Sequence, residues 1–224
     1  MALPAIETHG PVEAWIVDDT SFPKKGTHSV GVARQYCGLL GKQDNCPAAV
    51  SLSLANAHAS LPVAYRLDLP RAWASDAARR KEAGVPEGIA FKTKPQIALD
   101  QIRAAVAAGL PRGVVLMDAG YGVDGALRTA ITGLGLRYVA GVLSTTTVWV
   151  PGQEPLPPKP YQPGRGRPTK RLRRDAEGSA GHGQGLGARA SRRGLAVGSL
   201  AGGNECVARV ALRPPADPPG LSRL

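Results

Sequence analysis

The sequence predicts an α/β fold in which helices lie on the faces of a mixed sheet. Short apolar or alternating runs come first, and two helical patterns then alternate with two continuous apolar runs. Meandering strands followed by helix, strand, helix and strand are typical of a mixed sheet with flanking helices. With 224 residues, of which 43% are hydrophobic, the chain is long enough for one core domain and a tail.

The first two strands are expected near the N-terminus. Residues 14–18 form a short apolar run, and residues 29–36 alternate between apolar and polar side chains. The segment between them contains Pro23 and Gly26, which are typical of a turn. These features predict two strands joined by a turn.

Residues 48–54 and 61–67 predict one or two further strands. Two neighbouring segments are expected to contain no strand. Residues 40–47 are polar and predict a turn, whereas residues 68–87 are charged and predict an exposed insertion.

The clearest helix begins after Thr93. Thr93 and Gln96 have the spacing of a capping box, and Pro95 lies in the first turn. Gly109 and Pro111 are typical of the helix end. The apolar residues expected on its inner face are Leu99, Ile102 and Val106.

Two strands buried on both faces are predicted around a second helix. Residues 113–117 and 137–143 are continuous apolar runs, which are typical of parallel strands covered on both sides. Residues 123–134 between them have helical spacing, with Leu127 and Ile131 facing inward.

Basic residues are concentrated in the C-terminal part of the chain. The net charge is +11, and residues 161–224 hold 12 basic and 4 acidic side chains, against 16 and 13 in residues 1–160. This excess favours an acidic partner such as nucleic acid. We interpret the proline-rich segment 151–177 as a basic linker that is either solvated or in contact with a phosphate backbone. Its candidate DNA-binding residues are Arg165, Arg167, Lys170, Arg171, Arg173 and Arg174.

Residues 178–224 predict a disordered, basic C-terminal tail. They contain no Ile, Phe, Tyr, Trp, Met, Lys or Thr and show no helical or strand period. Two hypotheses remain open: a naturally disordered tail, or a GC-rich coding sequence read out of frame after about Glu177. The predicted organisation is thus a core over residues 12–150, the linker 151–177 and this tail.

Three aspartates follow predicted strands. Asp18 and Asp19 end the first strand, and Asp118 follows the buried strand after the first helix. Two carboxylates about 4 Å apart at an effective dielectric constant near 20 repel by roughly 4 kcal/mol. A divalent ion such as Mg²⁺ or Mn²⁺ reverses that sign and supports phosphoryl transfer. The spacing leaves open whether these acids bind a metal or cap the elements that follow them.

Four segments carry a resemblance to a known family. They are WIVDDTSFPKKG (15–26), HSVGVARQY (28–36), FKTKPQ (91–96) and VLMDAGYG (115–122). In this order they resemble the DDE transposases of bacterial insertion sequences, specifically the IS701-like branch of the IS4-type group. The resemblance covers about residues 12–174. It implies an RNase H-like core and Mg²⁺-dependent cutting and rejoining of double-stranded DNA at transposon ends.

The resemblance also implies roles for individual residues. The first catalytic and metal-binding aspartate of the family precedes a Thr, which corresponds to Asp19, and the second corresponds to Asp118. Asp18 is the second choice, because alternation points its side chain to the other face of the strand. Lys24 and Lys25, in the turn after the first strand, are candidates for contact with a DNA phosphate, although exposed lysines are common in turns.

Two departures from the family pattern predict an inactive, truncated fragment. The third acid of the family is a Glu in the pattern Tyr-x2-Arg-x3-Glu, but Tyr161 is followed by Arg165 one place out of phase and by no Glu in position. The family's DNA-binding region precedes the first catalytic strand, and only about 13 residues do so here. The alternative is a non-catalytic DNA-binding remnant or regulator, whose partners would include a second copy or an intact transposase.

Gly120, Gly122 and Gly125 raise a different class of protein. The pattern G-x-G-x-x-G between a strand and a helix is the fingerprint of a dinucleotide-binding domain. However, no acid lies between Asp124 and Glu154, where a ribose-binding carboxylate is expected. A tight turn is therefore the preferred interpretation, and dinucleotide binding remains the other alternative.

Other classes of protein are excluded by composition. No apolar run approaches 18 residues, so no membrane span is expected. The first ten residues contain no basic residue, unlike a secretory signal. Three cysteines are too few for a disulfide framework. We therefore expect a cytoplasmic, nucleoid-associated protein.

Overall fold

Strand β1, over Ala14–Ser21, is an interior strand of the main sheet in the computed structural model of this chain. The structure describes residues 2–143, 156–158, 160, 164, 195–199 and 205–210. Trp15 and Val17 are 0% and 2% exposed, because alternate side chains of β1 point into the core.

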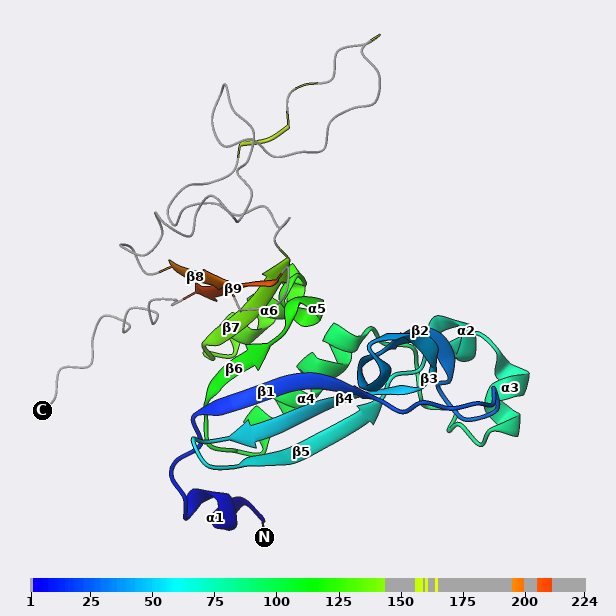
Figure 1. The fold of residues 1–224 in the computed structure, drawn as a ribbon, viewed down its shortest axis with the longest axis horizontal. Coiled ribbons are helices and arrows are strands. Elements are labelled where there is room, and N and C mark those ends of the chain that lie inside the picture. The colour runs from blue at the N-terminus through cyan, green and yellow to red at the C-terminus, as the bar shows by residue number, and fades with distance from the viewer. Residues whose placement is uncertain are drawn as a thin grey trace, which may run out of the picture.

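Four further strands complete the central part of the sheet, in the order β5-β4-β1-β6-β7 (Figure 1). On one side, β4 (Ala48–Ala55) pairs antiparallel with β1, and β5 (Ser60–Leu67) pairs antiparallel with β4. On the other side, β6 (Val114–Met117) and β7 (Tyr138–Leu143) run parallel to β1. This order and these directions form an RNase H-like α/β fold, so the predicted fold class is confirmed.

Helices α4 (Lys94–Ala107) and α6 (Gly125–Gly133) contribute the apolar side chains that cover one face of this sheet. In Figure 1, α4 runs behind β1 and β4. The predicted capping box is confirmed: Thr93 N donates to Gln96 Oε1 at 2.9 Å, and Gln96 N donates to Thr93 Oγ1 at 3.4 Å. Such a cap stabilises a helix by about 1 kcal/mol.

A separate short helix, α5 (Ala119–Gly122), precedes α6, so the helix predicted over 123–134 begins at Gly125 instead. Helix α5 packs directly on β7. A Cβ atom at Gly122 would lie 2.0 Å from the backbone oxygen of Gly141. A glycine is therefore required at position 122 for α5 to approach β7 this closely.

Strands β2 (Ala33–Cys37) and β3 (Lys42–Cys46) form a separate two-stranded sheet beyond the end of β1 (Figure 1). A 3-10 helix, Gly38–Leu40, joins them. The turn predicted over 40–47 is therefore wrong for β3, because backbone pairing with β2 stabilises an extended segment whose side chains are mostly polar.

Helices α2 (Arg71–Ala74) and α3 (Ala77–Glu82) lie beside this hairpin and form a lobe with it (Figure 1). Residues 68–87 are not a wholly exposed insertion, since Trp73 is 1% exposed. Its Nε1 donates to Val32 O at 2.7 Å, which ties α2 to the segment before β2.

Two strands lie within the segment predicted to be a disordered tail. Strand β9 (Glu205–Val210) pairs antiparallel with β7, and β8 (Leu195–Ser199) pairs with β9. These two short segments extend the sheet at the β7 edge, and the prediction for residues 178–224 as a whole stays a prediction. The rest of 178–224, and most of the linker 151–177, lie outside the described residues.

Helix α1 (Ala2–Glu7) precedes the sheet, and no sequence pattern predicted it. Within the described ranges, no helix combines the length and the apolar character that crossing a bilayer requires.

We expect Gly122→Ala to destabilise the protein by about 2–3 kcal/mol, because the added methyl group collides with the backbone of β7. Urea unfolding measures this change. Gly133→Ala is the matched control, since nothing lies within 4 Å of its added Cβ and alanine favours a helix. Equal stability of the two variants would show that α5 does not pack on β7 as described.

Candidate active site

The carboxyl ends of β1, β5 and β6 lie at one edge of the sheet, because these three strands run in the same direction. Four aspartates stand at or directly after these ends. Asp18 and Asp19 belong to β1, Asp68 follows β5, and Asp118 follows β6. The two catalytic candidates and the second-choice residue are thus brought to the same edge.

Asp19 is the most enclosed carboxylate of β1. It lies on the helix-covered face, opposite Val50 of β4, and its side chain is 24% exposed. Its Oδ2 forms an ion pair with Nζ of Lys94, the first residue of α4. The negative charge of Asp19 is therefore balanced by a cation in this structure.

Asp18 is exposed and lies on the opposite face of β1. Its Oδ1 accepts a hydrogen bond from Asp19 N at 2.8 Å, and its backbone oxygen accepts one from Ser51 Oγ at 3.2 Å. Partial burial raises the pKa of the Asp18 carboxyl, and the charges of Asp19 and Asp118 add to this rise, although the bond from Asp19 N opposes it. The ionised form of Asp18 is therefore disfavoured, first by burial and then by the neighbouring negative charges.

Asp118 follows directly on the paired residues Val17 and Met117, so the register carries it to the level of Asp18, with Asp19 one residue farther along. It is exposed and is the N-cap of α5, where its Oδ1 accepts from Tyr121 N at 3.2 Å. Asp118 thus caps helix α5, and it does so from its position at the sheet edge.

Sequence reasoning missed Asp68, and it did not predict that Lys94 pairs with Asp19. Asp68 is 9% exposed, and burial raises the pKa of its carboxyl, whereas Lys94 lowers it and Asp19 raises it. Asp68 therefore lies within electrostatic reach of both members of the ion pair. The one available signal was its position directly after the predicted strand 61–67.

The Tyr121 hydroxyl is buried close to these acids. It has no hydrogen-bond partner among the described residues. Burial raises the pKa of Tyr121 well above its usual value, and the charges of Asp19, Asp118, Asp18 and Asp68 raise it further. All four carboxylates thus act on one buried polar atom.

These donors fit a hard divalent cation held by few ligands. Mg²⁺ is typically bound by one or two carboxylates together with water and substrate phosphates. The described residues contain no group of three or more His, Cys, Asp or Glu side chains in metal-binding positions. A site in which the carboxylates of β1 and β6 are the protein ligands is consistent with both observations. Asp19 already contacts one cation, the ammonium group of Lys94.

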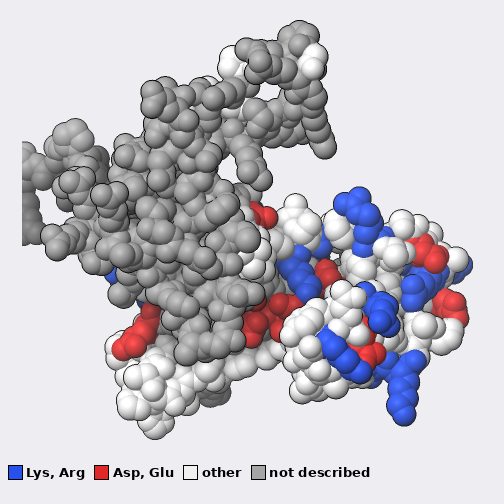
Figure 2. Space-filling view, turned by 45° about the horizontal axis from the view of Figure 1, so that its top comes forward, with Lys and Arg blue, Asp and Glu red and all other residues white. Residues whose placement is uncertain are grey.

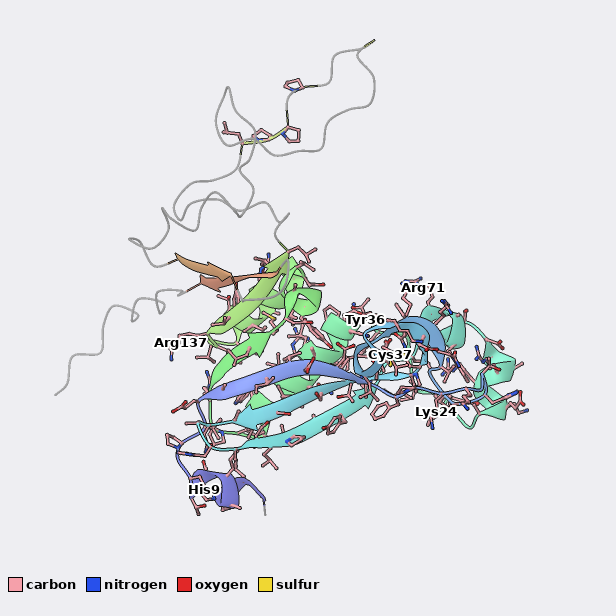
Figure 3. All side chains as sticks on the ribbon, in the orientation of Figure 1. His9, Lys24, Tyr36, Cys37, Arg71 and Arg137 are labelled. Carbon is pink, nitrogen blue, oxygen red and sulfur yellow. The ribbon has the colours of Figure 1, made fainter. Side chains whose placement is uncertain are left out.

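The loop carrying Lys24 and Lys25 follows β1 directly, and both lysines are exposed. Asn45 Nδ2 donates to the backbone oxygens of Lys24 and Gly26 at 2.9 and 2.7 Å. Arg79 of α3 donates to Thr27 O at 2.6 Å. The loop is thus held by the β2–β3 hairpin and α3, near which Figure 3 labels Lys24, whereas Arg165, Arg167, Lys170, Arg171, Arg173 and Arg174 lie outside the described residues.

The fingerprint glycines do not form a phosphate-binding loop. Gly120 and Gly122 lie inside α5, and Gly125 is the first residue of α6. The helix N-termini already hold carboxylates, since Asp118 accepts from Tyr121 N and Asp124 accepts from Leu127 N at 2.8 Å. The segment expected to be a tight turn is thus the short helix α5, and this arrangement disfavours a bound dinucleotide.

A sheet of this order, with carboxylates at the ends of β1 and β6, is the arrangement of RNase H-like nucleases. A family model described as DDE superfamily endonuclease matches residues 1–193. The chain therefore belongs to the DDE superfamily endonucleases, which act on DNA and generally use divalent metal ions.

A curated relative supports the same assignment. The chain is 32% identical over 130 residues to the "Probable transposase for insertion sequence element IS701" of Microchaete diplosiphon. The match covers 58% of this chain and 31% of the relative, so the chain spans about a third of the relative's length. No solved structure matches the chain significantly.

We expect Asp18→Asn to stabilise the metal-free protein at pH 7, on the order of 0.5 kcal/mol for a partly exposed charge. The folded-state pKa of Asp18 lies above its ordinary value of 3.8, so its ionised form destabilises the native state. The gain should disappear below pH 3.8, where the carboxyl is protonated in both states. Unfolding in urea at several pH values, with EDTA present, measures this dependence.

Asp44→Asn is the control of opposite sign. The hydrogen bond from Asn45 N, followed by that from Lys42, lowers the pKa of the exposed Asp44 carboxyl, so its loss should destabilise the protein at pH 7. A destabilising Asp18→Asn would contradict the inference that burial and neighbouring charges disfavour the ionised Asp18 carboxyl.

Proposed function

We propose that this chain carries the metal- and DNA-binding part of a DDE transposase site. The reaction of such a site is cleavage of DNA strands at insertion-sequence ends, followed by strand transfer. The observation that supports the proposal is the register of β1 and β6, which brings Asp19 and Asp118 to the same edge of the sheet. The loop with Lys24 and Lys25 continues directly from β1, so a cationic segment follows the acidic one in the chain.

Asp19 and Asp118 are the proposed metal ligands, with Asp18 as the second choice for the β1 ligand. The proposed ion is Mg²⁺ or Mn²⁺, since both prefer carboxylate oxygens. When bound, such an ion activates the attacking oxygen and stabilises the leaving oxygen of the phosphodiester. The chain's own contribution is to hold the two carboxylates on neighbouring strands, where the sheet limits their movement.

Lys24 and Lys25 are the proposed contacts to the DNA backbone within the described part of the chain. Figure 2 shows lysine and arginine side chains gathered over the lobe on the right, which α2, α3 and the β2–β3 hairpin form. Phosphate contacts of this kind are independent of DNA sequence and depend strongly on salt. The basic run from Arg165 to Arg174 is proposed to extend this contact.

We propose that the chain as it stands binds DNA without cutting it. No Glu of the sequence stands in the Tyr-x2-Arg-x3-Glu pattern that supplies the family's third acid. Glu205 begins strand β9 and belongs to no helix. DNA binding without cleavage would let the chain compete with an intact transposase at transposon ends on the nucleoid.

We expect Mn²⁺ to raise the thermal unfolding temperature of the protein. At ten times its Kd, a ligand stabilises the native state by about 1.4 kcal/mol, which corresponds to roughly 3–5 °C for a domain of this size. Differential scanning fluorimetry should show this shift, and Asp19→Asn and Asp118→Asn should each abolish most of it.

Asp44→Asn is the matched control for the metal experiment, because Asp44 is an exposed aspartate of the β2–β3 hairpin paired with Lys42. It should respond to Mn²⁺ as the unmodified protein does. An equal loss in all three variants would reject the site. Plasmid nicking that disappears in Asp19→Ala would overturn the inactive state.

We expect the double change Lys24→Gln and Lys25→Gln to weaken DNA binding without a preference for sequence. Loss of two phosphate contacts should reduce the slope of log K against log salt by about 2. Fluorescence anisotropy with a labelled duplex at several salt concentrations measures this slope.

Lys42→Gln is the matched control, because Lys42 is an exposed lysine in the same lobe whose charge Asp44 already balances. Its slope should remain that of the unmodified protein. An equal effect of Lys42 and of the loop lysines would assign binding to the lobe's overall charge and remove the loop's special role.

A further inference from the structure

Lys94 is the only lysine or arginine in the described part of the chain that forms an ion pair with an acid at the candidate site. Its Nζ contacts Oδ2 of Asp19, and its charge also lowers the pKa of the buried Asp68 carboxyl. One ammonium group thus acts on two of the carboxylates at the sheet edge.

The position of Lys94 is held by the start of α4. Thr93 is the N-cap of the helix, the capping box with Gln96 is complete, and Pro95 restricts the first turn. The backbone at Lys94 is therefore fixed beside β1, and the long side chain alone is free to change its partner.

The helix itself gives no reason for a cation at this place. The N-terminus of a helix carries a partial positive charge, so a lysine in the first turn is disfavoured by the helix dipole. Lys92 provides the contrast: it lies before the helix, and its Nζ pairs with Asp100, which Arg66 also contacts at 3.3 Å. The nearby carboxylates therefore explain why a lysine stands at position 94, whereas the helix dipole does not.

We propose that Lys94 is a positioning residue that holds the Asp19 carboxylate in the metal-free protein and competes there with the divalent ion. This inference rests on the proposed function, because it takes Asp19 as a metal ligand. Binding of the ion requires the Lys94–Asp19 contact to open. Lys94 thus keeps the carboxylate oriented and limits the repulsion at the edge until an ion arrives.

Removing this competition should tighten metal binding. Lys94→Gln is expected to lower the Kd for Mn²⁺ by about fivefold, the scale of one partly exposed ion pair. Lys92→Gln is the matched control, since Lys92 is the same residue type with a side chain 38% exposed, against 31% for Lys94. It should leave the Kd unchanged. Titration of Mn²⁺ followed by the electron paramagnetic resonance signal of the free ion measures all three proteins without DNA.

A second measurement uses the unmodified protein and does not depend on the folding of a variant. Acetylation of lysines is followed by mass spectrometry with and without Mn²⁺. The reactivity of Lys94 should rise at least threefold when the ion takes Asp19, whereas that of Lys92 should stay constant.

The outcomes separate this inference from the function on which it rests. Mn²⁺ binding that requires Asp19 but is unchanged in Lys94→Gln, with unchanged Lys94 reactivity, would overturn the role of Lys94 and leave the metal site standing. Binding that survives Asp19→Asn, or no binding in any variant, would overturn both.

Discussion

The parallel pairing of β1 with β6 is the constraint on which the rest of the structure depends. Its register places Trp15 opposite Val115 and Val17 opposite Met117, so Asp18 of β1 and Asp118, directly after β6, come to the same level. Because side chains alternate with a period of two, a slip of one residue would remove Trp15 and Val17 from the core and turn Asp19 away from α4. Core packing and site geometry are therefore enforced by the same alternation.

Placing several carboxylates at this edge of the sheet is electrostatically unfavourable, and neighbouring residues compensate only in part. Burial and mutual repulsion raise the pKa values of Asp18 and Asp68, and the same charges act on the buried Tyr121 hydroxyl. A single lysine from the neighbouring helix offsets part of this repulsion. The remaining negative charge favours a further cation at this edge, such as a divalent metal ion or another lysine side chain.

Local signals were sufficient for the elements whose sequence carries its own pattern. The apolar run of β1 and the capping box at Thr93 are contained within a few residues, and both were predicted from sequence. Strand β3 was not predicted, because it is stabilised by backbone pairing with β2 and not by its own side chains, which are mostly polar. The position of Asp68 and the pairing of Lys94 with Asp19 were not predicted for the same reason, since only the folded sheet brings these residues to Asp19.

Strand β3, which was predicted to be a turn, also explains how the loop after β1 is oriented. Asn45 reaches the backbone oxygens of both Lys24 and Gly26 because β3 is extended beside the loop, and a turn over 40–47 would not present its amide in this way. Arg79, whose guanidinium also stacks 3.7 Å from the Trp73 ring, holds the loop from the other side. The lobe inserted between strands of the core thus fixes the backbone of the loop that follows the acidic strand β1, whereas the side chains of Lys24 and Lys25 remain exposed.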